Sequence, residues 1–329
     1  MISDKADGGI GAVIIGRNEG ERLRRCLASV LPQVKSIVYV DSGSTDGSAN
    51  TAERLGVHVV RLDLAKPFTA ARARNEGFKA LKMIKPDIRL VQFIDGDCEL
   101  APDWIEAAVA LISQRKDIAV VCGRRRERYP ERSIYNRLCD FEWNTPVGET
   151  SMCGGDSLMR VDAFEAVSGF RPQLIAGEEP ELCLRLREQG WKIWRLDAEM
   201  TLHDVAMLHF SQWWNRAVRS GYGIANVVWL HMHSPFSIWR KAMMSSIFWG
   251  GLLPLTIIIT SLLYPAAIVV ALIYPIQISR LATRRDATAF YSWAYAVFVE
   301  FAMFAHVQGF LRFFWYRWRG HTGELIEYK

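Results

Sequence analysis

Two carboxylates one residue apart, Asp95 and Asp97, are the residues of this chain whose types and spacing point most directly to chemistry. They follow the apolar run Val91–Ile94, so we expect them at the tip of a buried strand. Buried carboxylates are costly unless cations or polar groups pair with them. Gly96 permits a sharp turn that lets both acids face one cation or sugar ring, and Mg²⁺ or Mn²⁺ would suit such oxygen ligands. The motif therefore predicts a site for a metal-bridged phosphate compound.

A second acidic pair, Glu178 and Glu179, begins a predicted helix directly after Gly177. The helix dipole favours acids in a first turn, which accounts well for Glu181. It accounts less well for two adjacent acids after a glycine. One of them is a candidate general base that takes a proton from an acceptor hydroxyl.

Three further polar positions are candidates for binding a phosphate-containing ligand. Asn18 and Asp41 come just after predicted strands, and Asp41 is placed to accept hydrogen bonds from a base or ribose. Arg74 lies near a predicted helix start, where a solvated basic face is the ordinary interpretation. Its fork geometry also suits a diphosphate.

One histidine adds a candidate metal or phosphate ligand. His203 follows a short strand-like run, 191–196, and a structural role is about as well supported as a metal or phosphate role.

The elements that must position these residues alternate between strand and helix signals. The strand signals lie at Ala12–Gly16, Ser36–Val40, Val57–Leu62, Leu90–Ile94 and Ile118–Cys122, and the helix signals at Glu21–Leu31, Thr51–Leu55, Ala70–Met83 and Pro102–Arg115. This alternation predicts an α/β fold with an open, mostly parallel sheet and helices on both faces. Such sheets bind ligands beyond the carboxyl ends of their strands, so Asn18, Asp41 and Asp95 should meet in one crevice.

Composition excludes several classes of protein. The chain has 329 residues and a net charge of only +5, which argues against a nucleic-acid-binding surface. Its six cysteines show no CxxC spacing, so a disulfide framework or zinc site is not expected and a reducing compartment is favoured. No GxGxxG joins the first strand to its helix, which argues against a dinucleotide-binding dehydrogenase.

The last third of the chain reads as membrane-attached. Residues 242–279 contain no charged side chain, and Glu300 is the one acidic or basic residue in 287–311. Because a span needs about 20 apolar residues, the first run suits two short spans or a re-entrant hairpin. The second run suits a span or an interfacial helix. The preceding segment, 210–229, is amphipathic and rich in tryptophan, as expected for a helix at a membrane surface.

Taken in order, several short motifs resemble the family 2 glycosyltransferases of GT-A fold. The resemblance covers roughly residues 10–230 and rests on VIIGRNEG, YVDSGSTDGS, ARARNEG, FIDGDCEL, CGGDSLMR followed by SGF, and GEEPELCLRLREQGW. It implies an enzyme that moves a sugar, with inversion, from a nucleotide-diphosphate sugar, by default a UDP-sugar, to a hydroxyl.

On the donor side, the resemblance implies a role for each matching residue. Asp41 looks like the base or ribose contact and Arg74 a donor contact. Asp95 looks like the ribose or sugar contact, and Asp97 looks like the ligand of Mg²⁺ or Mn²⁺. His203 is a second candidate ligand of that metal.

On the acceptor side, Gly155 and Asp156 resemble the acceptor loop. Glu179 matches the catalytic base, although the family usually has an aspartate there, so Glu178 stays a candidate.

Arg216 and Arg219 are expected either over the diphosphate or on lipid headgroups.

These features predict a lipid-linked (polyprenyl-diphosphate) saccharide as acceptor, in surface polysaccharide synthesis. The alternatives are a polyprenyl-phosphate glycosyltransferase and, outside enzymes, a membrane-anchored nucleotide-sugar-binding scaffold. A processive synthase is less well supported, because Gln212–Arg216 departs from the QxxRW spacing.

We expect five segments. They are a flexible lead-in (1–9), a GT-A catalytic domain (10–205), interfacial helices (206–241), hydrophobic membrane segments (242–316) and a tail (317–329). Basic residues around the apolar runs predict an inner-membrane protein with a cytoplasmic catalytic domain. The oligomeric state is not predicted.

Overall fold

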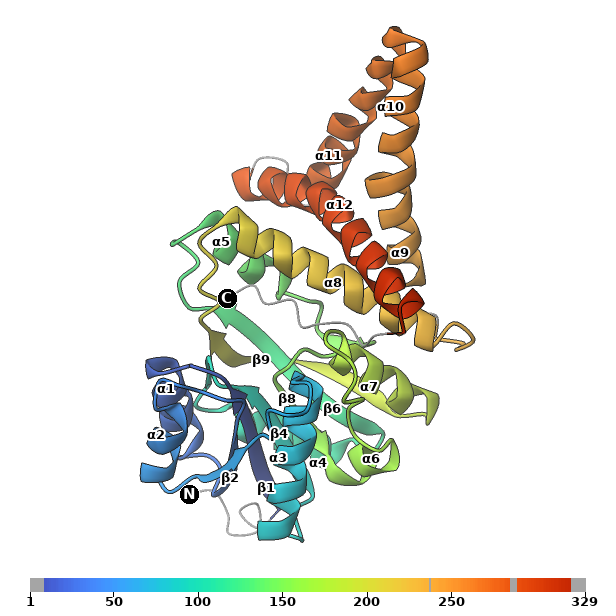
Figure 1. The fold of residues 1–329 in the computed structure, drawn as a ribbon. Coiled ribbons are helices and arrows are strands. Elements are labelled where there is room, and N and C mark those ends of the chain that lie inside the picture. Colours follow the sequence, from blue (N-terminus) through green and yellow to red (C-terminus); the bar gives the residue numbers. More distant parts are fainter. Residues whose placement is uncertain (1–8, 237, 285–288, 321–329) are drawn as a thin grey trace. The chain divides into compact units, whose positions relative to one another are not determined.

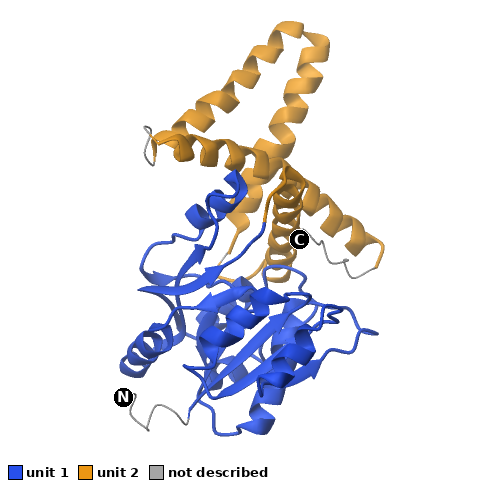
Figure 2. Cartoon of the chain, turned by 90° about the vertical axis from the view of Figure 1, so that its left-hand side faces the viewer, with its two compact units in different colours: residues 1–206 blue, residues 207–329 orange. Residues whose placement is uncertain are grey.

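The computed structural model describes residues 9–236, 238–284 and 289–320. The expected lead-in, apart from Gly9, and the tail beyond residue 320 lie outside these ranges. The chain divides into two compact units, residues 1–206 and 207–329, which Figure 2 colours separately.

The first unit is built on a nine-stranded sheet (Figure 1). Its strands are β1 (Ile10–Gly16), β2 (Ser36–Asp41), β3 (His58–Arg61), β4 (Leu90–Asp95), β5 (Cys98–Leu100), β6 (Ile118–Glu127), β7 (Gly148–Thr150), β8 (Ser157–Arg160) and β9 (Lys192–His203). Its helices are α1 (Glu21–Val30), α2 (Ser48–Arg54), α3 (Ala70–Ile84), α4 (Trp104–Gln114), α5 (Ile134–Glu142), α6 (Val161–Ala166) and α7 (Glu178–Glu188). Each strand and helix predicted from the alternation is present, with ends that differ by a few residues.

The strand order explains how the expected site forms. The sheet runs β3-β2-β1-β4-β8-β6-β9-β5, with β7 pairing on β9. The pairs β2–β3, β1–β2 and β1–β4 are parallel, whereas β8 runs antiparallel to both β4 and β6. The carboxyl ends of β1, β2 and β4 therefore lie at one edge, as the mostly parallel interpretation predicted.

Helix α3 packs directly on this parallel part of the sheet through Gly77. A Cβ atom at Gly77 would lie 2.4 Å from Val13 Cγ1 and 2.7 Å from Val40 Cγ2. The glycine thus permits a close approach that places the first turn of α3, with Arg74, near the strand ends.

The second unit is helical and largely apolar. It contains α8 (Phe210–Leu230), α9 (Arg240–Ile247), a π-helical turn η1 (Phe248–Leu252), α10 (Leu253–Leu263), a 3₁₀ helix η2 (Pro265–Leu272), α11 (Ile273–Thr283) and α12 (Phe290–Trp318). Helices α8 and α12 pack closely at Gly309, where the absence of a side chain permits the contact. A Cβ there would lie 2.3 Å from the Val218 carbonyl oxygen. The Trp214 indole also donates a hydrogen bond to Gln308 Oε1 at 2.8 Å.

Among the described residues of this unit, three helical stretches are long and apolar enough to cross a membrane: Arg240–Leu263, Pro265–Thr283 and Phe290–Trp318. The uncharged run thus forms two helical stretches, as expected for two short spans or a hairpin. They separate at Pro265, whereas Pro254 and Pro275 lie within helices. Helix α12 continues to Trp318, two residues beyond the predicted end of the membrane segments at residue 316.

Candidate active site

The ends of β2 and β4 bring Asp41 and Asp95 to either side of β1. Gly16 of β1 pairs with Asp41, and Ile15 pairs with Asp95. The Gly96 amide donates to the Ile15 carbonyl at 2.8 Å, so the chain turns as soon as β4 ends. The structure therefore brings these two acids to one edge, as the strand pattern predicted.

Asn18 joins the loops that follow β1 and β2. Its Oδ1 accepts a hydrogen bond from the Thr45 amide at 2.8 Å, and its own amide donates to Ser44 Oγ at 2.9 Å. Asp41 Oδ2 accepts from the Gly43 and Ser44 amides at 3.1 and 3.0 Å. These bonds hold the loop after β2 in a defined shape.

That loop borders a hollow of about 450 Å³. Its lining residues are Asp41, Gly43, Ser44, Thr45, Gly47, Ala49, Asn50, Arg61, Leu62 and Leu64. A partly apolar hollow of this volume with a few convergent polar groups is suited to a small organic ligand. Arg61, at the end of β3, is a wall residue that the sequence did not predict. It pairs with Glu53 at 2.6 Å.

Arg74 gathers three carboxylates from distant parts of the chain. It is 2% exposed and lies 2.8 Å from Asp95 Oδ1, 3.0 Å from Glu178 Oε1 and 2.8 Å from Glu179 Oε1. We call Arg74, Asp95, Glu178 and Glu179 the Arg74 cluster. The structure thus places Arg74 between the two acidic motifs, rather than on a solvated helix face.

Burial and charge shift the pKa values of this cluster in opposite directions. Burial opposes ionisation of Asp95, but Arg74 and Arg125 outweigh it and lower its pKa to about 2. For Glu179, burial and the neighbouring Glu178 outweigh Arg74 and raise the pKa to about 7. Asp95 is therefore a permanent anion at neutral pH, whereas Glu179 exchanges a proton there.

The position of Glu178 and Glu179 follows from the start of α7. Gly177 caps the helix with φ 82°, a left-handed conformation that glycine adopts without strain. The chain enters the helix sharply there, and the first two helical residues meet Arg74.

Asp156 is fully buried beneath the strand ends. Its Oδ1 accepts from the Asp95 amide at 3.0 Å, and its Oδ2 accepts from Thr201 Oγ1 at 2.7 Å and lies 2.7 Å from Arg125 Nη2. Next to it, a Cβ at Gly155 would lie 2.7 Å from both Arg74 Nη2 and Asp95 Oδ2. The predicted acceptor-loop residues therefore lie directly against the Arg74 cluster, with the Asp156 carboxylate turned inward.

Arg125 is a site residue that the sequence did not predict. It contacts Asp156 and Asp95 and lies over the ring of Trp143 at 5.5 Å. Its neighbours Arg124 and Arg126 instead pair with Asp140. No sequence signal singled out Arg125, because the predicted strand ended at Cys122 and did not reach it.

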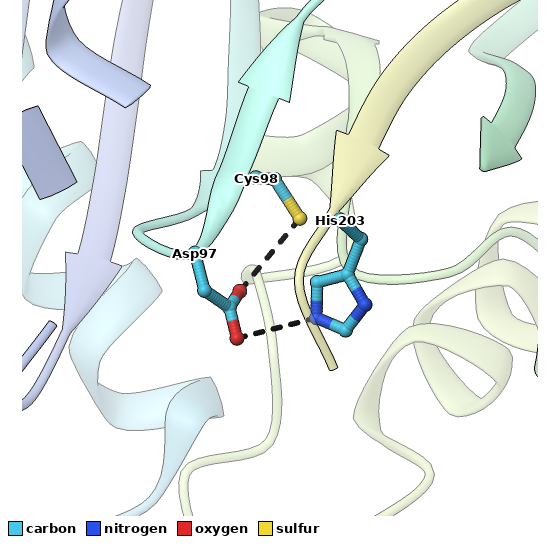
Figure 3. A group of neighbouring side chains, drawn as sticks. All are labelled: Asp97, Cys98 and His203. Atoms are coloured by element: carbon cyan, nitrogen blue, oxygen red, sulfur yellow. Dashed lines mark hydrogen bonds and ion pairs between the residues drawn. The ribbon is translucent and has the colours of Figure 1, made fainter. Parts of the chain in front are cut away.

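A third group lies where β5 meets β9, and Figure 3 shows its three side chains pointing toward one another. His203 Nε2 is 3.2 Å from Asp97 Oδ2, and the Cys98 thiol lies 3.7 Å from Asp97 Oδ1. Their ligand atoms all lie within 4.8 Å of one another, a spacing that one metal ion could bridge. The structure brings Asp97 and His203 together as predicted, and it adds Cys98.

His203 is better described as a neutral imidazole than as a member of an ion pair. Burial and the nearby Arg125 lower its pKa to about 4. It ends β9, which is longer than the predicted run 191–196, so His203 is held in the sheet ladder. Its Nδ1 is buried without a hydrogen-bond partner among the described residues. A neutral imidazole beside a carboxylate is a fitting donor set for a divalent cation.

Arg216 and Arg219 lie on α8 in the second unit. Their proposed contact with a diphosphate stays a prediction.

Comparisons with known proteins agree with this geometry. The model of the family described as Glycosyl transferase family 2 matches residues 12–167. Glycosyltransferase AglE of Haloferax volcanii is 24% identical over 213 residues, 61% of this chain and 66% of that protein. Succinoglycan biosynthesis protein ExoA of Rhizobium meliloti is 28% identical over 186 residues, 54% of this chain and 55% of that protein. The chain thus matches between about half and two thirds of the length of these relatives.

Two solved structures share the fold. The mannosyltransferase PcManGT from Pyrobaculum calidifontis, in complex with GDP-Man and Mn²⁺, has a TM-score of 0.57 at 16% identity, covering 93% of this chain and 87% of that chain. Glucosyl-3-phosphoglycerate synthase from Mycobacterium tuberculosis, in complex with Mn²⁺, UDP-glucose and phosphoglyceric acid, has a TM-score of 0.50 at 19% identity, covering 68% of this chain and 80% of that chain. Residues 12–167 thus match glycosyl transferase family 2, and the chain shares the GT-A fold of these structures and carries apolar C-terminal helices.

Proposed function

We propose that this glycosyltransferase moves a sugar, with inversion, from a nucleotide-diphosphate donor to a hydroxyl of a lipid-linked saccharide. The observation that carries the proposal is the environment of Glu179. This carboxylate is held 2.8 Å from Arg74, which also binds Asp95, and its pKa is raised to about 7. A general base works best when its pKa lies near the operating pH.

The reaction follows from these positions. Glu179 takes the proton of the acceptor hydroxyl, and the oxygen attacks the anomeric carbon from the face opposite the nucleotide. The bond from that carbon to the diphosphate oxygen breaks, and its electron pair leaves with the diphosphate. Asp97 and His203 would hold a divalent cation, which would supply positive charge for the leaving group.

On the donor side, we assign Asp41 to the base or ribose, because it lines the hollow beside β2. Asn18 shapes the same loop. Asp95 is assigned to the ribose or sugar. Arg74 Nε, buried without a partner among the described residues, leaves this arginine one N–H for the donor.

On the acceptor side, we assign the loop at Gly155 and Asp156 to the incoming saccharide, with the buried Asp156 carboxylate holding the loop in place rather than touching the sugar. Arg216 and Arg219 are proposed over the diphosphate or against lipid headgroups.

Two observations support a lipid-linked acceptor. Three helices in the second unit have the length and composition of membrane spans. ExoA, one of the relatives, is named for succinoglycan biosynthesis. We therefore propose an inner-membrane enzyme whose catalytic unit faces the cytoplasm, with Arg240 and Lys241 on that side.

The test is turnover of the full-length protein in detergent with UDP- and GDP-sugars, with and without lipid extract. Glu179→Gln should lower nucleotide release by about 10²- to 10⁴-fold while donor binding persists. Glu188→Gln, at the other end of α7, is the matched control and should leave turnover unchanged.

Near-normal turnover of Glu179→Gln would contradict the base assignment, and a parallel Glu178→Gln variant would show whether its neighbour is the base. A product in which the sugar is attached to a lipid phosphate would identify a polyprenyl-phosphate glycosyltransferase instead. Donor binding without any turnover would identify a scaffold.

A further inference from the structure

The β5–β9 ladder places a thiol beside the predicted metal ligands. Cys98 of β5 is the antiparallel partner of His203 of β9. Directly opposed residues in an antiparallel pair project to the same face, with Cβ atoms about 4.5–5.5 Å apart. The closeness of thiol and imidazole is thus a property of the backbone register.

The side chains agree with the register. Cys98 Sγ lies 3.7 Å from Asp97 Oδ1, and Asp97 Oδ2 lies 3.2 Å from His203 Nε2. Cys98 is fully buried and His203 is 5% exposed. The ring nitrogen that faces Asp97 is Nε2, so Nε2 is the imidazole atom that a shared ion would use. Carboxylate, imidazole and thiol therefore meet in one buried group (Figure 3).

We propose that Cys98 is a third protein ligand of the metal and that its sulfur favours Co²⁺, Zn²⁺ or Cd²⁺ over Mg²⁺. Mg²⁺ demands hard oxygen ligands, whereas thiolate and imidazole ligands favour the softer divalent ions. This inference rests on the proposed function, in which Asp97 and His203 would hold a divalent cation. Binding through sulfur displaces the thiol proton to solvent, because the thiolate is the ligand.

The ordinary alternative is that Cys98 is a small buried residue of the core. Free cysteines are among the most buried residue types, and the cysteines of this chain are all buried. A packing role predicts that replacing sulfur by oxygen changes stability and leaves the choice of metal unchanged. The two interpretations therefore differ in metal selectivity.

The test is titration of the full-length protein in detergent with Co²⁺ and Cd²⁺, with and without UDP or GDP. Thiolate-to-metal charge-transfer absorption in the ultraviolet is the readout. The wild type should develop this absorption stoichiometrically. Cys98→Ser should lose it and bind Cd²⁺ at least about tenfold more weakly, while Mg²⁺ binding is unchanged. Cys122→Ser, a buried cysteine on β6 outside the group, should behave as wild type.

Absence of the absorption from the wild type, or its persistence in Cys98→Ser, would overturn the proposal. If Cys98→Ser fails to fold, Cys98→Ala is the second variant, and the same loss of absorption is expected. Activity separates this inference from the proposed function: a transferase supported equally by Mg²⁺ in wild type and Cys98→Ser would refute the role of Cys98 and leave the function standing. Loss of all metal dependence would count against both.

Discussion

The Arg74 cluster and the Asp97–Cys98–His203 group begin at neighbouring positions in the sequence but differ in how their charges are balanced. Asp95 is held as an anion by Arg74 and Arg125 and has a pKa of about 2. Two residues on, Asp97 faces an imidazole that is neutral at pH 7 and a thiol. One acid is paired with cations of the protein, whereas the other lies among donors that suit an added cation. We therefore propose that the two acids have different roles: Asp95 positions neighbouring groups, and Asp97 binds the metal.

The largest expected effect tests the metal side of this comparison. Asp97→Asn should lower sugar transfer by roughly 10³-fold, because charge stabilisation of a leaving group commonly contributes this much. A chelator should abolish wild-type activity and have little further effect on the variant. The measurement is steady-state turnover over a range of Mn²⁺ concentrations.

Asp103→Asn, just before α4 and outside the site, is the control for this substitution and should be as active as wild type. Full activity of Asp97→Asn in the presence of chelator would remove the distinction between the two acids.

A second prediction tests the protein's own cations. Arg125→Met leaves Asp156 buried without its arginine, and breaking a buried pair costs about 3–5 kcal/mol. Arg126→Met is the matched control on the next residue. Its exposed bridge to Glu199 should contribute at most about 1 kcal/mol.

The measurement is denaturant unfolding of both variants in the same detergent. Equal losses of unfolding free energy in the two variants would show that Arg125 contributes no more to stability than its exposed neighbour Arg126.

The smallest effect is a shift along the pH axis. Glu179 must be deprotonated to act as a base, so kcat/KM should rise through its pKa of about 7. Arg74 lowers that pKa, so Arg74→Gln should move the acid limb of the profile to higher pH. Arg74→Lys keeps the charge and should move it less. An acid limb at the same pH in all three proteins would disprove the coupling.

The sequence predicts most of what is local in this fold. The alternation of apolar strands and helices, and the acids at the ends of β2 and β4, are encoded within short segments. The strand ends then meet because neighbouring strands are parallel. Asp41 and Asp95 were predictable for this reason.

What could not be predicted depends on pairing between distant segments. Cys98 meets His203 through a register that joins positions more than a hundred residues apart. Arg125 and its neighbours Arg124 and Arg126 contact different partners, because they lie on different faces of β6. The strand that pairs with β6 cannot be identified from the sequence. The role of Arg74 likewise depends on α7 starting beside it.

The two glycines of the Gly154-Gly155 pair differ as targets for engineering. A side chain at Gly155 would collide with Arg74 and Asp95, whereas a Cβ at Gly154 would meet no described atom within 4 Å. At position 155 there is no room for a side chain between the loop and the acids, whereas at position 154 there is room for one. Acceptor preference should be redesigned by adding side chains at position 154, with position 155 kept as glycine.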